Sequence, residues 1–261
     1  MLKIEGAGAV ITGGSGGIGM ALARRWLELG GRAVIADING EALEKAKAEL
    51  GGGVETFVGN VTREEDCSAL AAFAMEKMGR INLVAPFAGI IRDGLLLSPD
   101  RETGKVTGKM SLQDWQMVVD INLTGVFLTV RECAEQMINH RCRGLICLVS
   151  STGSLGTAGQ INYASTKAAM SVMPKVITAE FFRRKIADRI RCVAIAPGYV
   201  GTDMVRNMNQ KALDKILAEV PIGRLIEPEE VATLACDIYK NEALAGETYF
   251  IHGGLRLGSR G

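Results

Sequence analysis

Two side chains four residues apart, Tyr163 and Lys167, are the first candidates for chemistry in this sequence. They open a segment with helical spacing, and positions i and i+4 of a helix lie on one face, so the ammonium is expected near the phenol oxygen. A free tyrosine has a pKa of about 10, and a neighbouring cation lowers it by favouring the phenolate. We therefore expect Lys167 to lower the pKa of Tyr163, so that the phenol exchanges protons near neutral pH. Taken alone, the spacing is also that of an ordinary pair on a helix surface.

A hydroxyl group stands close by in the expected fold. Ser150 and Ser151 follow the apolar run LICLV, which has the character of a buried strand. Ligands bind at the carboxyl ends of strands in doubly wound folds, so a serine at this place could donate a hydrogen bond to a substrate oxygen.

A glycine-rich turn, TGGSGGIG, joins the first apolar run to a helical segment. Glycine permits positive φ and close approach of a ligand, while the free N–H groups and the dipole at a helix start favour a pyrophosphate. The next apolar run ends at Asp37, where a dinucleotide fold places an acid against the adenosine ribose. A carboxylate there repels a 2′-phosphate, and no Arg or Lys stands beside it, so the sequence favours NAD(H) over NADP(H). Tight packing of the glycines and a helix-start role for Asp37 remain open on the pattern alone.

Short apolar runs alternate with helical segments along the whole chain. The expected strands are 7–11, 33–36, 54–58, 81–85, 145–149, 190–196 and 248–251, and the expected helices include 18–29, 40–50, 64–78, 111–138 and 164–182. This alternation predicts parallel pairing, and runs without polar residues indicate a sheet covered on both faces. We expect an α/β, doubly wound Rossmann fold, a seven-stranded parallel sheet with helices on both faces, as a single dinucleotide-binding and catalytic domain over residues 1–261. The polar insertion at residues 98–109 predicts an extended loop or exposed hairpin, either merely solvated or facing a partner or the substrate.

Composition excludes several classes of protein. The 30 basic and 29 acidic residues give a net charge of +1, so neither a nucleic acid nor an anionic membrane is an expected partner. No apolar run approaches the roughly 18 residues of a membrane span, and the first residues lack a secretory signal, so we expect a soluble cytoplasmic protein. Six cysteines without a C-x-x-C pair are expected to be buried thiols, and the two distant histidines offer no metal site.

Taken together, these features resemble the short-chain dehydrogenase/reductase family. The features are the glycine turn, Asp37, the strand-end serine and the Tyr-x-x-x-Lys pair, and the resemblance extends to Asn122 in DINLTG, to PGYVGTDM (197–204) and to HGG (252–254). It covers nearly the whole chain and implies an NAD(P)-dependent enzyme.

The resemblance also implies roles for individual residues. Tyr163 would exchange the proton with the reacting oxygen, Lys167 would lower its pKa and hold the nicotinamide ribose, and Asn122 would fix a water that links Lys167 to solvent. A serine after the fifth of the seven strands would orient the substrate oxygen, while hydride passes between nicotinamide C4 and the substrate carbon. The implied cofactor-binding residues are Gly13, Ser15, Gly17, Ile18, Gly19, Asp37, Asn60, Val61, Ala88, Gly89, Tyr163, Lys167, Pro197, Gly198, Val200 and Thr202.

Two family intervals disagree about which serine takes that role. Counting back thirteen residues from Tyr163 gives Ser150, whereas counting forward seven from Gly144 gives Ser151. Neighbouring strand residues face opposite sides, so only one can serve. Because a strand slip would invert a buried strand while loops change length easily, we choose Ser151.

The sequence departs from the family in two places. Pro86 and Phe87 stand where the family commonly has two asparagines, so an amide that braces the strand ends is missing and cofactor affinity is expected to suffer. Asn60 replaces a frequent aspartate, and its amide oxygen is expected to accept a hydrogen bond from adenine.

The substrate is expected to have an apolar part. Residues 199–225, with several methionines and leucines, resemble the family's substrate lid, although a helix burying its usual face is equally open. The motifs Gly159-Gln160-x-Asn162-Tyr163 and Gly201-Thr202-Asp203-Met204 look closest to the 3-oxoacyl-thioester (acyl-carrier-protein) reductase branch. We therefore expect interconversion of a secondary alcohol and a ketone, such as a 3-hydroxyacyl and a 3-oxoacyl thioester of fatty acid metabolism.

Two other functions fit parts of the sequence. A catalytically idle dinucleotide sensor or scaffold is the main alternative, and Pro86 with Phe87 is its best argument. A nucleotide-sugar epimerase or dehydratase of the longer relatives is disfavoured because its glycine spacing differs and no second substrate domain is expected. Relatives assemble through the helices expected at 111–138 and 164–182, so a homotetramer is expected.

Overall fold

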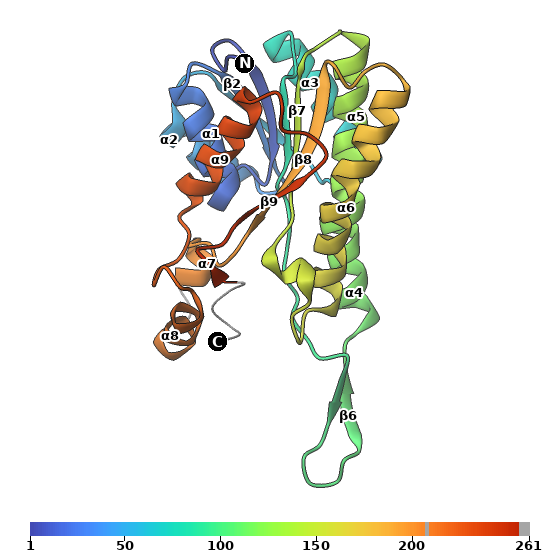
Figure 1. The fold of residues 1–261 in the computed structure, drawn as a ribbon, viewed down its shortest axis with the longest axis vertical. Helices are drawn as coiled ribbons and strands as arrows, with labels where there is room; N and C mark the ends of the chain where they lie inside the picture. The colour runs from blue at the N-terminus through green and yellow to red at the C-terminus, as the bar shows by residue number, and fades with distance from the viewer. Residues whose placement is uncertain (207–208, 256–261) are drawn as a thin grey trace.

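The computed structural model describes residues 1–206 and 209–255, which contain a seven-stranded parallel sheet (Figure 1). The strands lie in the order β3-β2-β1-β4-β7-β8-β9. Their bounds are β1 Gly8–Thr12, β2 Arg32–Asp37, β3 Val54–Val58, β4 Leu83–Pro86, β7 Gly144–Val149, β8 Ile190–Pro197 and β9 Thr248–Ile251. All seven strands expected from the sequence are therefore confirmed, each within two residues of its expected ends.

Helices cover both faces of this sheet. Helices α1 (Gly17–Glu28), α2 (Gly40–Leu50) and α9 (Pro228–Lys240) pack on one face, and α3 (Glu64–Met78), α5 (Gly125–Asn139) and α6 (Ile161–Arg183) pack on the other. Successive strand residues point into different cores, as Ile11 and Val10 do, and both are fully buried. The doubly wound Rossmann fold is thus confirmed.

The chain changes direction across the sheet between β1 and β4. It runs from β1 outward to β2 and β3, and then returns to place β4 on the other side of β1. The last paired residue of β1, Thr12, lies opposite Ala36 of β2 and Pro86 of β4. A crevice forms at the carboxyl ends of strands where the order reverses in this way.

The helical segment expected at 111–138 is not uniform. It consists of α4 (Leu112–Val119), a π-helical turn (Asp120–Thr124) and α5. Helical spacing of apolar residues does not distinguish a π-turn from α-helix, and such turns are frequent at functional sites. Helix α9 was not among the expected helices, although Glu227 and Glu230 form a capping box at its start.

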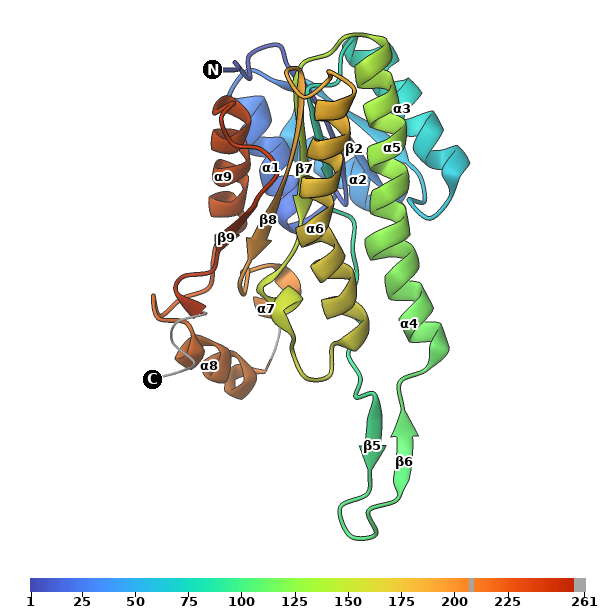
Figure 2. The same ribbon diagram turned by 45° about the vertical axis from the view of Figure 1, so that its right-hand side comes forward.

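The insertion at 98–109 forms an antiparallel hairpin, which confirms the expected exposed hairpin. Strands β5 (Leu97–Pro99) and β6 (Val106–Lys109) pair only with each other, and Figure 2 shows the hairpin extending away from the body. At its tip, the Asp100 carboxylate accepts hydrogen bonds from the backbone and the hydroxyl of Thr103, each at 2.8 Å.

The expected lid at 199–225 contains α7 (Asp203–Arg206) and α8 (Gln210–Glu219), which lie beyond the lower end of the sheet in Figure 1. Residues 207 and 208 of that segment lie outside the described residues. A short 3-10 helix, η2, spans Thr152–Leu155. Across the described chain, no helix combines the length and the apolar character that crossing a membrane requires. All six cysteines are buried and unpaired, as expected.

Candidate active site

The turn between β1 and α1 requires glycine at two positions. Gly13 has a φ of +65°, and a Cβ atom there would lie 2.8 Å from the backbone nitrogen of Ala88. A Cβ atom at Gly19 would overlap the carbonyl oxygen of Gly13. At Gly16, by contrast, a Cβ atom would meet nothing within 4 Å. The turn therefore packs tightly against the chain after β4 on one side and is open to a ligand on the other.

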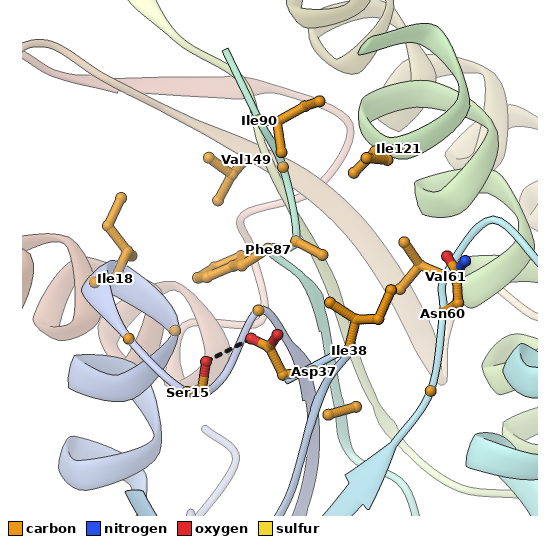
Figure 3. A pocket seen from close by; sticks show the side chains of 18 of the residues that line it. Ser15, Ile18, Asp37, Ile38, Asn60, Val61, Phe87, Ile90, Ile121 and Val149 are labelled. Carbon is orange, nitrogen blue, oxygen red and sulfur yellow. Dashed lines mark hydrogen bonds between the residues drawn. The ribbon is translucent and has the colours of Figure 1, made fainter. Parts of the chain in front are cut away.

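A cavity of about 500 Å³ opens at the start of α1 (Figure 3). The residue before the helix, Gly16, provides no side-chain cap, and the first turn holds no acidic residue. The helix dipole and free N–H groups there favour an anion such as a pyrophosphate. Eleven of the expected cofactor-binding residues line this cavity: Gly13, Ser15, Gly17, Ile18, Gly19, Asp37, Asn60, Val61, Ala88, Gly89 and Thr202.

The carboxylate of Asp37 stands at one end of the cavity. It accepts hydrogen bonds from the Ser15 hydroxyl at 2.6 Å and from the backbone N–H of Asn39 at 3.2 Å. A carboxylate has about four acceptor positions, so it retains capacity for ribose hydroxyls. Among the described residues that line the cavity, none is Arg or Lys. The residues present thus fit a dinucleotide, with a glycine cradle for the pyrophosphate and an acid for a ribose.

Asn60 lines the cavity, and a neighbouring residue engages its amide oxygen. That oxygen accepts hydrogen bonds from the backbone N–H of Thr62 at 3.0 Å and from its hydroxyl at 2.8 Å. These two bonds compete with the hydrogen bond expected from adenine, so that contact of the amide oxygen stays a prediction. The side-chain NH₂ group remains, and it is a donor.

Thr12 braces the strand ends where Pro86 and Phe87 replace the family's amides. Its hydroxyl oxygen accepts a hydrogen bond from the N–H of Ala88, and its carbonyl oxygen accepts one from the N–H of Phe87, both at 3.2 Å. The Phe87 side chain lines the cavity, as Figure 3 shows, and packs against the same core as Ile18. The missing amide is therefore replaced by a threonine on the neighbouring strand.

Tyr163 and Ser151 meet at the start of α6. Their side chains are hydrogen-bonded, and the Ser151 oxygen also accepts the N–H of Gly153 at 3.0 Å. A Cβ atom on Gly153 would lie 3.3 Å from the Ser151 oxygen and 3.5 Å from Cε1 of Tyr163. The two hydroxyl-bearing side chains therefore converge over a glycine, which leaves room for a substrate.

Ser150 points away from this site. It is buried, and its hydroxyl donates to the carbonyl oxygen of Lys167 and pairs with the Ser171 hydroxyl, each at 2.7 Å. Ser150 thus fastens β7 to α6, while Ser151 stands beside the phenol. This geometry supports the choice of Ser151 that strand register suggested.

Lys167 connects the phenol to the cavity. Its ammonium nitrogen donates to the carbonyl oxygen of Val149 at 2.9 Å and lies 5.5 Å from the ring centroid of Tyr163. Val149 lines the cavity, whereas Asn122, Ser151, Tyr163 and Lys167 do not. The two parts of the predicted site therefore adjoin at Val149.

The acidity of the phenol differs from expectation. Burial raises the pKa of Tyr163, the hydrogen bond to Ser151 lowers it and the charge of Asp93 raises it, with a net rise. Burial also lowers the pKa of Lys167 to about 8. The net lowering expected for the pKa of Tyr163 is therefore not found, because burial outweighs the contributions that lower it. The support of a phenolate by Lys167 stays a prediction.

Asn122 lies fully buried in the π-helical turn. Its amide oxygen accepts the N–H of Ile90 and its amide nitrogen donates to the carbonyl of Ile90, both at 2.8 Å. Ile90 lines the cavity, so Asn122 fixes the chain that forms one cavity wall.

The remaining predicted residues follow β8. The N–H of Gly198, after Pro197, donates to the carbonyl of Ile251 at 2.9 Å, and Val200 pairs with Ile226. Thr202 lies across the cavity mouth from the glycine turn, since a Cβ atom on Gly17 would be 3.4 Å from its methyl group.

Sequence reasoning missed several apolar residues of the cavity wall: Ile38, Phe87, Ile90, Ile121 and Val149. The sequence identifies Phe87 only as a departure from the family and Ile38 only as the uncharged neighbour of Asp37, and neither was predicted to line the cavity. Over residues 1–206 and 209–255, no three His, Cys, Asp or Glu side chains gather as a metal site would need.

The reversed strand order, the glycine turn and the cavity between them define a protein of the dinucleotide-binding α/β class. A family model described as short chain dehydrogenase matches residues 7–213. The chain therefore belongs to the short-chain dehydrogenase/reductase family, whose members are oxidoreductases that bind a nicotinamide dinucleotide.

Individual relatives agree with this assignment. Nodulation protein G of Rhizobium sp. (strain N33) is 33% identical over 262 residues, covering 98% of this chain and 100% of that protein. The 3-oxoacyl-(acyl-carrier-protein) reductase FabG of Thermotoga maritima is 32% identical over 259 residues, covering 97% and 99%. A crystal structure of a short-chain dehydrogenase/reductase, glucose/ribitol dehydrogenase, from Brucella melitensis has a TM-score of 0.84 at 26% identity, covering 97% and 98%.

Proposed function

We propose that the protein is an NAD(H)-dependent oxidoreductase that interconverts a secondary alcohol and a ketone, with Tyr163 as the general acid and base. The observation that carries this proposal is the convergence of the Tyr163 phenol and the Ser151 hydroxyl beside Lys167, next to a cavity that fits a dinucleotide.

The bound dinucleotide supplies or removes hydride at the substrate carbon. The chain's own residues act on the oxygen. Ser151 donates a hydrogen bond that orients it, and Tyr163 gives its phenolic proton to a carbonyl oxygen in reduction or takes a proton from an alcohol in oxidation. Lys167 supports the resulting phenolate by its positive charge, and Asn122 is proposed to hold a water on the path from Lys167 to solvent.

The proposed preference for NAD(H) rests on Asp37. Its negative charge lies in the cavity with no lining cation to receive a 2′-phosphate. The nearby Arg24 forms ion pairs with Glu49 and Glu229, so its charge is compensated. The names of the relatives state no cofactor, so this preference depends on the site alone.

The proposed substrate pair is a 3-hydroxyacyl and a 3-oxoacyl thioester of fatty acid metabolism. Support comes from the FabG relative, which is named a 3-oxoacyl-(acyl-carrier-protein) reductase and aligns over nearly its whole length. Residues 199–225 would form the lid over the acyl part. This assignment of the segment stays a proposal, as does the treatment of residues 1–261 as a single domain.

A second candidate is a catalytically idle dinucleotide sensor, and the aromatic ring of Phe87 in the cavity wall favours it. Turnover separates the two candidates. NADH oxidation with a panel of 3-oxoacyl thioesters and simple ketones is expected to be fast with wild type and lost in Tyr163→Phe. A protein that binds NADH but does not oxidise it in the presence of any of these carbonyl compounds would instead be the sensor.

A homotetramer is proposed because α6 carries large apolar side chains on its outer surface, where a monomer leaves them in water. In one chain, part of α6 is open, with Val172 58% and Val176 50% exposed. A second copy would cover this face through a two-fold interface. The cytoplasmic location expected from the sequence stays a prediction.

A further inference from the structure

The segment between β4 and the hairpin is fastened to the residues just ahead of Tyr163. The N–H of Gly94 donates to the carbonyl of Gly159 at 2.7 Å, and Gly94 forms a parallel bridge with Gln160. The buried amide of Asn162 donates to the carbonyl of Arg92 at 2.8 Å. The GQ-x-NY motif of the sequence therefore holds residues 92–94 against the start of α6.

The Gln160 side chain contacts the Asp93 carboxylate and lies near the ring of Tyr163. Its amide nitrogen is 3.1 Å from both carboxylate oxygens of Asp93. Its amide oxygen would be 3.5 Å from a Cβ atom on Gly153, the same point that lies 3.5 Å from Cε1 of Tyr163. The Gln160 amide thus contacts the Asp93 carboxylate through its nitrogen, while its oxygen lies near the ring of Tyr163.

We propose that Asp93 is a positioning residue of the proton-transfer site, held by Gln160 on the side of Tyr163, where its charge sets the pH range in which the phenol donates a proton. A negative charge disfavours the phenolate, and Asp93 contributes to the raised pKa of Tyr163 after burial. Reduction needs the protonated phenol and extends to higher pH for this reason, while oxidation needs the phenolate and begins at higher pH. These consequences for reduction and oxidation rest on the proposed function, whereas the effect of Asp93 on the titration of the Tyr163 phenol does not.

Other charged groups near Tyr163 do not replace Asp93. Lys167 lies over the ring but donates its hydrogen bond to Val149. The short helix η2 carries no charged residue. The other helical elements packed against α6 carry Asp114 and Asp120, which are bonded to Ser111 and Gln116. Among the carboxylates of the described residues, only Asp93 contributes to the raised pKa of Tyr163.

The test is a titration of phenolate ultraviolet absorbance in the free protein. Subtracting the matched Tyr163→Phe protein in each background isolates Tyr163. We expect Asp93→Asn, which can still accept from Gln160, to move this titration to lower pH with an unchanged melting temperature. Because Asp93 is exposed, added salt should shrink the difference between the two proteins. Glu102→Gln, which removes an exposed acid of the hairpin, should leave the titration in place.

Two outcomes overturn the inference. One is an Asp93→Asn titration that coincides with that of wild type. The other is a Gln160→Leu titration that stays at the wild-type position, because the carboxylate is then not held by Gln160. Neither measurement needs a substrate, so they decide the inference even if no ketone is turned over. If the proposed function holds, the high-pH limit of reduction moves to lower pH in Asp93→Asn with kcat retained on the plateau.

Discussion

The ammonium nitrogen of Lys167 lies 2.9 Å from the carbonyl oxygen of Val149, although Tyr163 stands one helical turn away. Val149 is the last residue of β7, and β7 pairs with β4 only at Leu145 and Ile146, so Val149 lies beyond that ladder. The lysine of α6 therefore donates to the end of a strand, at the edge of the sheet where the cavity opens.

The two serines should respond differently to replacement by alanine. Ser151→Ala removes a hydrogen bond to the reacting oxygen, and we expect kcat to fall by about 10²-fold with the melting temperature unchanged. Ser150→Ala removes two buried hydrogen bonds, and we expect a loss of about 1–3 kcal/mol in the free energy of unfolding with most activity retained. Steady-state kinetics and urea unfolding of both variants check this. A large loss of kcat in Ser150→Ala alone would reverse the assignment.

The glycine turn allows a matched pair of variants. Gly13→Ala places a Cβ atom 2.8 Å from the Ala88 nitrogen at a positive φ, and we expect it to lower the free energy of unfolding by about 1–3 kcal/mol. Gly16→Ala meets open space, so the free energy should change by less than about 0.5 kcal/mol. Chemical denaturation without dinucleotide measures both. Equal losses of unfolding free energy in the two variants would show that a Cβ atom at Gly13 meets no more steric conflict than one at Gly16.

Much of the fold could be predicted because buried parallel strands and their helices leave strong local patterns. The run GLICLV, for example, contains no polar residue, and β7 is buried on both faces as expected. The π-helical turn at Asp120–Thr124 was missed because its apolar spacing is that of the flanking helices. The capping box of Glu227 and Glu230 at the start of α9 is a local sequence signal for a helix, and the sequence-based prediction did not include it.

The site was less predictable because its hydrogen bonds join residues that are distant in sequence or compete locally. Lys167 has two nearby partners, the phenol and a strand carbonyl, and only tertiary packing decides between them. Asn60 has the right type for an adenine contact, but Thr62 two residues later takes its oxygen. Such competition between a neighbour and a ligand is common for Asn and Asp in turns.

Removing the charge of Asp37 should change cofactor preference. We expect the double variant Asp37→Asn, Ile38→Arg to raise the ratio of kcat/KM for NADPH to that for NADH by at least about 10-fold, because repulsion of the 2′-phosphate is replaced by attraction. The control Glu41→Gln removes an acid from the first turn of α2 that does not line the cavity, and should leave the ratio unchanged. Wild-type protein that uses both cofactors equally well would contradict the role of Asp37.

The open face of α6 predicts the assembly interface. We expect the double variant Val172→Lys, Val176→Lys to dissociate the proposed tetramer, because lysine charges would have to be buried between copies. Light scattering after gel filtration measures the mass. Val58→Lys, at a 62% exposed position at the end of β3, should assemble as wild type does. A wild-type monomer would remove the basis of this interface.

The buried amine of Lys167 should make stability depend on pH. Its pKa is lowered from 10.5 to about 8 in the folded protein, so between these values the unfolded chain binds the extra proton and stability rises with pH. Below about pH 8 the folded state carries a buried charge at a cost of about 3 kcal/mol. Lys167→Met removes this dependence. Its free energy of unfolding relative to wild type should therefore be highest below about pH 8 and decline steadily up to about pH 10.5, while catalysis is lost. Lys175→Met, an exposed lysine on the same helix, should show no such trend. Parallel pH curves for wild type and Lys167→Met would mean that the amine is not desolvated, and the link between the phenol and Val149 would then have to be reconsidered.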